Sequence, residues 1–207
     1  WDFVVSGKEI AIELYKVGAI KFGDFTLKSG IKSPYYIQLR HLTNYPDLLF
    51  RIGELLGYLI TDNIKDVDKI VGVAYAGIPL VIATSLASSI PCCYTRKEIK
   101  EHGIPVFIEG EVKDGENIVI VDDLITDGQS KLETIDKVKN TGVMFNVKGV
   151  AVLLDREQGG KETLAKHNIP IFSAMTITEV ATWLNEDGLL PNETYKKIVT
   201  YTRSHSK

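Results

Sequence analysis

The chain has 207 residues, of which 44% are hydrophobic and 25% are charged, and its formal net charge is -3 at pH 7. This composition is typical of a folded globular domain and excludes a disordered or fibrous protein. The small acidic excess excludes general affinity for nucleic acid, which requires a concentrated positive surface. The two cysteines, Cys92 and Cys93, are adjacent and match neither a disulfide framework nor a zinc site, which favours a reducing, cytoplasmic compartment. No apolar run approaches the roughly 20 residues that span a bilayer, so we expect no membrane association.

Residues 1–65 and 66–207 differ in their sequence patterns. The first part has helix-period segments at Glu9–Val17 and Pro46–Asn63, separated by a polar, glycine-containing stretch. The second part alternates apolar runs rich in Val and Ile with helix-period segments, and a final helix follows Asn192, which suits an N-cap. The apolar runs are Lys69–Ala74, Asn117–Asp123, Val147–Asp155 and Ile169–Met175, and the helical segments are Ile78–Ser88, Ser130–Thr141 and Gln158–Lys166.

Apolar runs of this kind are typical of strands that are buried on both faces. Their alternation with helices predicts an α/β fold with a doubly wound, mainly parallel sheet flanked by helices. No internal repeat or low-complexity linker divides the chain, so we expect a single domain over residues 1–207.

Two adjacent acids, Asp122 and Asp123, end one of the predicted strands. Ligands of open parallel sheets bind beyond the carboxyl ends of the strands. Burial of two carboxylates requires compensation, because each loses its hydration and the like charges repel. A ribose diol that donates two hydrogen bonds, with a magnesium ion nearby, would provide it. An isolated pair of this kind could equally cap a loop or a helix.

A short polar turn follows the acids, just before the next helix. It contains Thr126, Asp127, Gly128, Gln129 and Ser130. Backbone N–H groups at such a turn form a site for anions, and the N-terminus of the helix strengthens it. The pattern therefore predicts a ribose and metal site joined to a phosphate site.

The stretch IVIVDDLITDGQS, from Ile118 to Ser130, resembles the phosphoribosyl diphosphate (PRPP) signature of type I phosphoribosyltransferases. Phe22–Arg40, Tyr94–Gly103 and Leu153–Leu164 resemble, in the same order, the N-terminal segment, the mobile catalytic loop and the orotate-binding segment of orotate phosphoribosyltransferases. The sequence DREQGGK is especially similar to the transferase half of UMP synthases. The resemblance implies the type I phosphoribosyltransferase fold, with a small N-terminal hood at about 1–65 and a PRPP-binding core at about 66–207.

The same resemblance implies a reaction and its partners. PRPP and orotate would be converted to orotidine 5'-monophosphate and pyrophosphate in pyrimidine biosynthesis. The cofactor would be Mg²⁺, held mainly by PRPP, with Asp122 and Asp123 as indirect ligands. In the family the mobile loop reaches into the neighbouring subunit, which implies a homodimer with shared active sites.

Arg96, Lys97, Lys100 and His102 would form the catalytic loop and contact PRPP. A basic cluster is often only a solvated surface, but these side chains could also stabilise the charge on departing pyrophosphate. Tyr75, in the segment Gly72–Leu80, would contact PRPP together with the acids and the polar turn. Ala76 and Gln38 depart from the lysine and aspartate that many relatives have at these places, which leaves their roles open.

The orotate-binding residues implied by the resemblance are Lys28, Tyr35, Tyr36, Thr126 and Arg156. An arginine can bind a carboxylate through two parallel hydrogen bonds, and orotate carries one carboxylate. Arg156 could alternatively form a structural ion pair, and the two tyrosines could belong to the core.

Two other functions explain part of the pattern. A type I transferase for adenine or a hypoxanthine-like purine would share the PRPP signature but not the three orotate-type stretches. A PRPP-binding regulator without turnover would not need the complete basic loop. The chain could be a stand-alone enzyme or the transferase domain of a bifunctional UMP synthase.

Overall fold

The computed structural model describes residues 5–26, 30–97, 107–139 and 142–205. The N-terminal part begins with helix α1 (Gly7–Lys16), and two antiparallel strands, β1 (Ile20–Thr26) and β2 (Lys32–Ile37), follow it. A 3-10 turn (Leu39–Asn44) then leads to helix α2 (Pro46–Asn63), whose bounds agree with those predicted. The polar stretch between the two predicted helices is therefore largely a β-hairpin. The sequence pattern missed it because several side chains of β1 are only partly buried and do not alternate strictly.

The described residues contain a sheet of six strands in the order β5-β4-β3-β6-β7-β8. Every pairing in it is parallel except that of β4 with β5, so the predicted α/β fold with a mainly parallel sheet is confirmed. The strands are β3 (Lys69–Gly72), β4 (Cys92–Thr95), β5 (Ile108–Glu109), β6 (Asn117–Ile125), β7 (Asn146–Asp155) and β8 (Ile171–Thr176). The first two residues of the predicted loop, Tyr94 and Thr95, belong to β4, which was not predicted.

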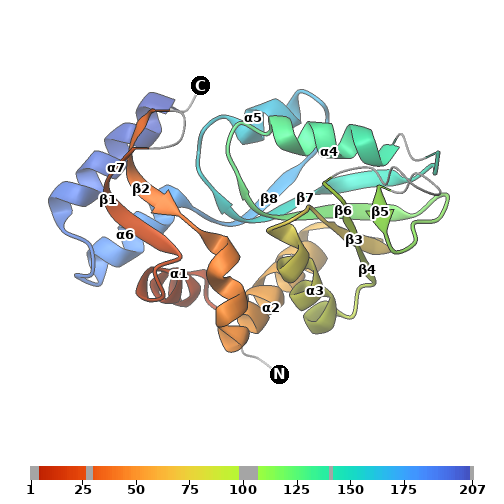
Figure 1. Cartoon of the computed structure of the whole chain (residues 1–207), viewed down its shortest axis with the longest axis horizontal. Coiled ribbons are helices and arrows are strands. Elements are labelled where there is room, and N and C mark those ends of the chain that lie inside the picture. The colour runs from red at the N-terminus through yellow and green to blue at the C-terminus, as the bar shows by residue number, and fades with distance from the viewer. Residues whose placement is uncertain (1–4, 27–29, 98–106, 140–141, 206–207) are drawn as a thin grey trace.

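Helices cover both faces of this sheet (Figure 1). Helices α2 and α3 (Gly77–Ser88) lie on one face, and α4 (Gln129–Lys139) and α5 (Gly160–Ala165) lie on the other. Since successive residues of a strand point to opposite faces, β6 contributes to two cores. Val119 and Val121 belong to the core that includes α2, and Ile118 and Ile120 belong to the core that includes α4.

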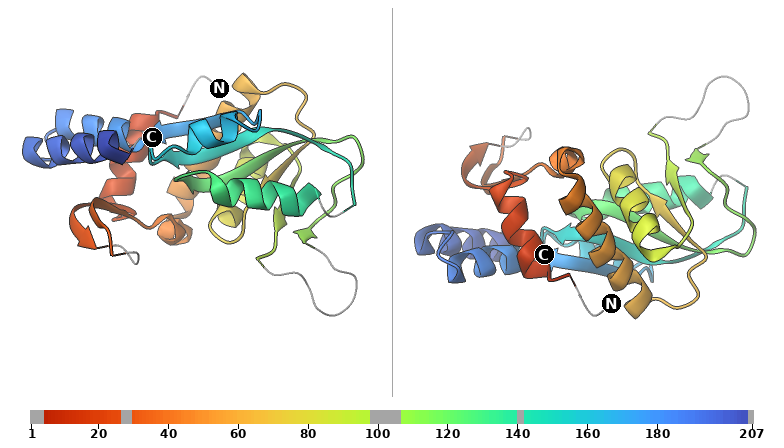
Figure 2. Two further views of the ribbon diagram at one scale, coloured as in Figure 1. Left: turned by 90° about the horizontal axis from the view of Figure 1, so that it is seen from above. Right: turned by 90° about the horizontal axis from the view of Figure 1, so that it is seen from below.

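The C-terminal helices α6 (Ile177–Glu186) and α7 (Asn192–His205) pack with α1 and β2, away from β5 at the other end of the molecule (Figures 1 and 2). Helix α6 was not predicted, although a capping box marks its start. The N–H of Glu179 donates to Oγ1 of Thr176 at 3.1 Å, and the N–H of Thr176 donates to Oε2 of Glu179 at 2.7 Å. Asn192 is the first residue of α7 rather than the residue before it. The N-terminal elements α1 and β2 therefore pack with the C-terminal helices, and the division near residue 65 stays a prediction.

Among the helices that the structure describes, none is both long enough and apolar enough to cross a lipid bilayer.

Candidate active site

The acidic pair lies where β6 continues beyond its neighbour β3. Gly72, the last residue of β3, pairs with Val121, whereas β6 stays paired with β7 as far as Ile125. The strand therefore runs two residues further than predicted, and Asp122 and Asp123 lie within it. They are nevertheless at the carboxyl end of β3, which is the position that ligand-binding residues take in open parallel sheets.

Asp122 forms a buried ion pair with Lys131 in the first turn of α4. Each residue is only 5% exposed. The ammonium group thus supplies much of the compensation that the sequence pattern assigned to a ligand. Lys131 was not identified from the sequence, although it directly follows the polar turn.

Asp123 is in a different electrostatic state. Burial, together with the neighbouring carboxylate of Asp122, raises the pKa of Asp123 to about 7. Its Oδ1 accepts a hydrogen bond of 2.8 Å from the backbone N–H of Leu124. Near neutral pH this carboxyl group can therefore exchange its proton as a ligand arrives.

The segment between β3 and α3 is held against β6. The N–H of Val73 donates to the carbonyl oxygen of Val121 at 3.0 Å. A Cβ atom on Gly77 would lie 2.7 Å from that same oxygen and 3.1 Å from Oδ1 of Asp122, so only glycine permits this approach. Tyr75 and Ala76, which follow Val73 and a cis Ala74–Tyr75 peptide bond, line the same cavity as the two acids.

The polar turn from Thr126 to Gln129 packs closely against the segment after β7. Gly128 has a φ of +82°, and a Cβ atom on it would lie 3.0 Å from the carbonyl oxygen of Gly160. Asp127 accepts a 3.1 Å hydrogen bond from the N–H of Gln129 through Oδ1, which caps the start of α4. The turn therefore has a defined shape at the N-terminus of an 11-residue helix.

One cavity of about 440 Å³ joins the acidic pair, the segment after β3 and Ser130, whereas Thr126 to Gln129 of the polar turn do not line it. Its walls come from the end of β2 and the following 3-10 turn, the segment after β3, and β6 with the start of α4. The lining residues are Tyr36, Ile37, Gln38, Leu39, Arg40, Val73, Ala74, Tyr75, Ala76, Asp122, Asp123, Leu124 and Ser130. Arg40 is the one cationic side chain in this lining within the described residues, and the sequence pattern did not identify it as a site residue.

Two of the four predicted catalytic residues, Arg96 and Lys97, are described. Arg96 forms an ion pair with Glu109 of β5, and Nζ of Lys97 lies 5.8 Å from the centre of the Tyr75 ring. A smaller cavity of about 270 Å³, which includes both basic residues in its lining, shares Ala74 and Tyr75 with the larger one. Lys100 and His102, and also Lys28 of the predicted orotate site, lie outside the described residues.

The two predicted aromatic contacts occupy different environments. Tyr36 is 40% exposed and lines the large cavity, whereas Tyr35 is 1% exposed. Neighbouring residues of a strand point to opposite sides, so only one of them can face the cavity. Arg156 is half-buried with its guanidinium carbon 5.3 Å from the centre of the Tyr35 ring, and Thr126 is half-buried at the end of β6.

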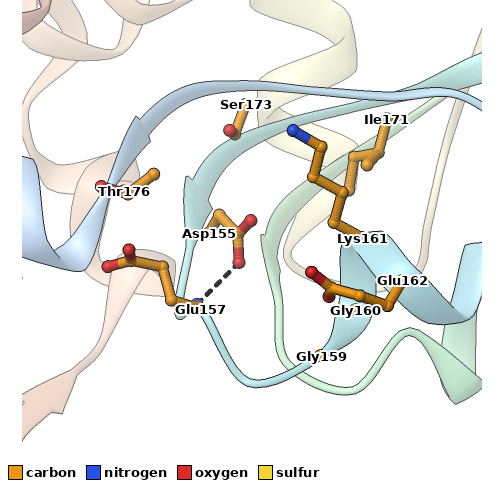
Figure 3. Close-up of a pocket in the computed structure, with 9 residues that line it drawn as sticks. All are labelled: Asp155, Glu157, Gly159, Gly160, Lys161, Glu162, Ile171, Ser173 and Thr176. Carbon is orange, nitrogen blue, oxygen red and sulfur yellow. Dashed lines mark hydrogen bonds between the residues drawn. The ribbon is translucent and has the colours of Figure 1, made fainter. Parts of the chain in front are cut away.

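Another cavity, of about 280 Å³, lies at the carboxyl ends of β7 and β8 beside α5 (Figure 3). Its acids have structural roles. Asp155 accepts a 2.7 Å hydrogen bond from the N–H of Glu157, and Glu157 accepts one of 2.9 Å from the N–H of Thr178 near the start of α6. Burial raises the pKa of Asp155. None of the predicted site residues lines this cavity.

The described residues hold no group of three or more His, Cys, Asp or Glu side chains suited to a metal ion. The acids in the large cavity number two, and Lys131 already neutralises one of them. This donor set fits a cation that arrives with most of its ligands supplied by a phosphorylated substrate.

The parallel sheet, the acidic pair beyond β3 and the turn that begins α4 together define a phosphoribosyltransferase. Residues 39–187 match the family model described as a phosphoribosyl transferase domain. A Methanocaldococcus jannaschii protein named orotate phosphoribosyltransferase is 38% identical over 168 residues, which are 81% of this chain and 92% of that protein. The chain belongs to the orotate phosphoribosyltransferase family.

Solved structures agree with this assignment. The UMP synthase of Leishmania donovani superposes with a TM-score of 0.84 at 30% identity, over 96% of this chain and 42% of that chain. The orotate phosphoribosyltransferase of Mycobacterium tuberculosis in complex with PRPP superposes with a TM-score of 0.68 at 25% identity, over 84% of this chain and 98% of that chain. The present chain therefore spans less than half of the UMP synthase and almost all of the single-function enzyme.

Proposed function

We propose that this protein transfers the 5-phosphoribosyl group from PRPP to orotate, which yields orotidine 5'-monophosphate and pyrophosphate. The observation that carries the proposal is the cavity of about 440 Å³ that joins the acidic pair, Tyr75 and the hood residue Tyr36. Names of the relatives support orotate as the acceptor, and the complex of the Mycobacterium tuberculosis enzyme supports PRPP as the donor.

PRPP would bind along the carboxyl ends of β3 and β6. The turn from Thr126 to Ser130 would hold the 5'-phosphate through backbone N–H groups at the start of α4. Asp122 and Asp123 would accept hydrogen bonds from the ribose hydroxyl groups. Tyr75 and Arg40 would lie along the diphosphate, where the guanidinium supplies the positive charge that Ala76 lacks.

Orotate would bind between the hood and the segment after β7. Arg156 would bind its carboxylate, and Tyr36, Thr126 and Lys28 would line the rest of the base site. We propose Tyr36 rather than Tyr35 as the aromatic residue that contacts the base, because Tyr36 faces the cavity and Tyr35 is buried.

The reaction forms a bond between orotate N1 and ribose C1 while the bond from C1 to the diphosphate oxygen breaks. The bonding electrons leave with pyrophosphate, so negative charge grows on that group. Arg96, Lys97, Lys100 and His102 would stabilise this charge and exclude water when the loop closes. Catalysis would then consist of positioning and charge stabilisation, without a covalent intermediate on the enzyme.

Mg²⁺ would be held mainly by the diphosphate and ribose hydroxyl groups of PRPP, with Asp122 and Asp123 as indirect ligands, and would supply further positive charge to the leaving group. The raised pKa of Asp123 fits this arrangement, because a nearby cation favours the ionised carboxylate.

The active unit would be a homodimer in the cytoplasm, with active sites shared between subunits. Large apolar side chains are exposed on two adjacent helices: Phe50 and Tyr58 on α2, and Ile82 and Leu86 on α3. Large apolar groups on neighbouring exposed surfaces are typical of association sites. This α2–α3 surface adjoins the segment that carries Tyr75, so a second copy bound there would lie close to the active site.

The test is the loss of orotate absorbance in the presence of PRPP and Mg²⁺, with pyrophosphate release measured in parallel for adenine and hypoxanthine. Magnesium-dependent turnover with orotate alone is the expected result. Pyrophosphate release with a purine instead would identify that purine, and not orotate, as the acceptor. PRPP binding without turnover on any base would indicate a regulator.

A further inference from the structure

Tyr35 has an environment that direct contact with a substrate does not explain. It is 1% exposed, and its hydroxyl oxygen is buried without a hydrogen-bond partner in the part of the chain that the structure describes. Burial of an unpaired hydroxyl group is unfavourable. Arg156 nevertheless acts on this hydroxyl group, because its positive charge opposes the rise that burial causes in the pKa of Tyr35.

The ring of Tyr35 supports Arg156. The guanidinium carbon lies 5.3 Å from the ring centre, within the range of a cation–π interaction. Nε of Arg156 is also buried without a hydrogen-bond partner among the described residues. On this side the guanidinium therefore lies against the Tyr35 ring, and its charge also acts on the Tyr35 hydroxyl group.

The other contacts of Tyr35 connect it to the C-terminal helix. Its ring meets that of Tyr201 in α7 edge to face, with the ring centres 5.7 Å apart. The Tyr201 ring in turn stacks on that of His205, with the ring centres 4.1 Å apart. Such aromatic pairs restrict one another's rotation, so α7 holds the Tyr35 ring in place beneath Arg156.

We infer that Tyr35 is a positioning residue for orotate recognition, which acts through Arg156 and does not touch the base. The ring fixes the guanidinium in the orientation that receives a carboxylate, and the packing of α7 on the hood maintains the ring. This inference rests on the proposed function, in which Arg156 binds the orotate carboxylate. It assigns the two adjacent tyrosines separate tasks, since Tyr36 faces the cavity.

The test compares Tyr35→Phe, which keeps the ring, with Tyr35→Leu, which removes it. Tyr35→Leu should raise the KM for orotate about 5- to 30-fold and change the KM for PRPP less than about 2-fold. Tyr35→Phe, which loses only the hydroxyl group, should raise the KM for orotate less than Tyr35→Leu does and keep the KM for PRPP within about 2-fold. Tyr15→Leu is the matched control, because Tyr15 packs on Phe22 elsewhere in the hood and should lower the melting temperature without a selective effect on orotate.

A second measurement does not require turnover. In a ¹H–¹⁵N spectrum, the Nε–H resonance of Arg156, assigned by its loss in Arg156→Lys, should carry a ring-current shift in the wild type and in Tyr35→Phe but not in Tyr35→Leu. If Tyr35→Leu does not fold, Tyr201→Leu should reduce the same shift and raise the KM for orotate. If the wild-type protein shows the ring-current shift but does not turn over orotate, the proposed function is refuted, while the inference that Tyr35 positions Arg156 stands.

Three results would overturn the inference. An equal rise of the KM for orotate in Tyr35→Phe and Tyr35→Leu would mean that the hydroxyl group, and not the ring, carries the effect on orotate. Equal rises of both KM values in Tyr35→Leu would indicate a structural role alone. An unchanged Arg156 resonance in Tyr35→Leu would show that the ring does not position the guanidinium.

Discussion

Lys131, in the first turn of α4, forms a buried ion pair with Asp122 on β6. This contact joins the helix that follows the polar turn to the strand that carries the acidic pair. It also makes the two acids unequal, because Asp122 has its own cation while Asp123 has a raised pKa. The pair therefore combines one carboxylate in a buried ion pair with one carboxyl group whose pKa is raised.

Replacing Lys131 by methionine should destabilise the protein by about 3 to 5 kcal/mol, because it leaves the buried charge of Asp122 without a partner. Urea unfolding monitored by circular dichroism measures this. The double variant Lys131→Met with Asp122→Asn should recover most of the loss. Lys139→Met, at an exposed position in the last turn of the same helix, should change stability by less than about 0.5 kcal/mol. A single variant as stable as the control would mean that the ion pair contributes nothing.

Asp123 should make the stability of the folded protein depend on pH. Its pKa is raised from 3.8 to about 7, so between these values the folded protein keeps a proton that the unfolded chain has released. The associated stabilisation is complete below the lower value and is lost as the pH rises through the higher one. Relative to the wild type, Asp123→Asn should therefore gain about 1 to 3 kcal/mol between about pH 5 and about pH 8.

Chemical denaturation of both proteins at several pH values tests this dependence, and a difference that stays constant with pH would contradict it. The wild type should also bind PRPP with Mg²⁺ more tightly as the pH rises towards about 8, since the ionised carboxylate is the better ligand. Calorimetry should show that Asp123→Asn lacks this trend.

Arg40→Gln should raise the KM for PRPP at least about 10-fold and leave the KM for orotate within about 3-fold, because a charged hydrogen bond to the diphosphate is lost. Steady-state kinetics with each substrate varied in turn measures both constants. Arg203→Gln, at an exposed position in α7, is the control and should change neither. Equal effects on the two KM values would place Arg40 outside the diphosphate site.

Leu86→Glu should weaken self-association, because it places a charge in the α2–α3 surface, where Leu86 is 72% exposed. Sedimentation should give a dimer for the wild type and a shift towards the monomer mass of 23.0 kDa for the variant, with loss of turnover at low concentration. Met144→Glu, at a residue that is 78% exposed outside this surface, should leave the dimer intact. A variant dimer as stable as the control would show that subunits associate elsewhere.

Local patterns in the sequence determined the core of the fold. The strands β3, β6, β7 and β8 were predicted because each is a run of apolar residues, and helix α2 because its period and Pro46 are local signals. The acidic pair and the polar turn were identified for the same reason, since strand, acids, glycine and helix start follow one another within thirteen residues. Their positions in the structure agree with this order.

Structural features that depend on contacts between segments far apart in the chain could not be predicted from local sequence patterns. The ion pair of Asp122 with Lys131, the burial of Tyr35 under Arg156 and the entry of Arg40 into the cavity each require a particular packing of strand, helix and hood. The two adjacent tyrosines illustrate the limit. The resemblance implied that both contact orotate, with the core as the alternative, and only the strand's orientation decides that Tyr36 lines the cavity while Tyr35 is buried. Tertiary packing determines side-chain direction, burial and charge partners, because these depend on residues far away in the chain.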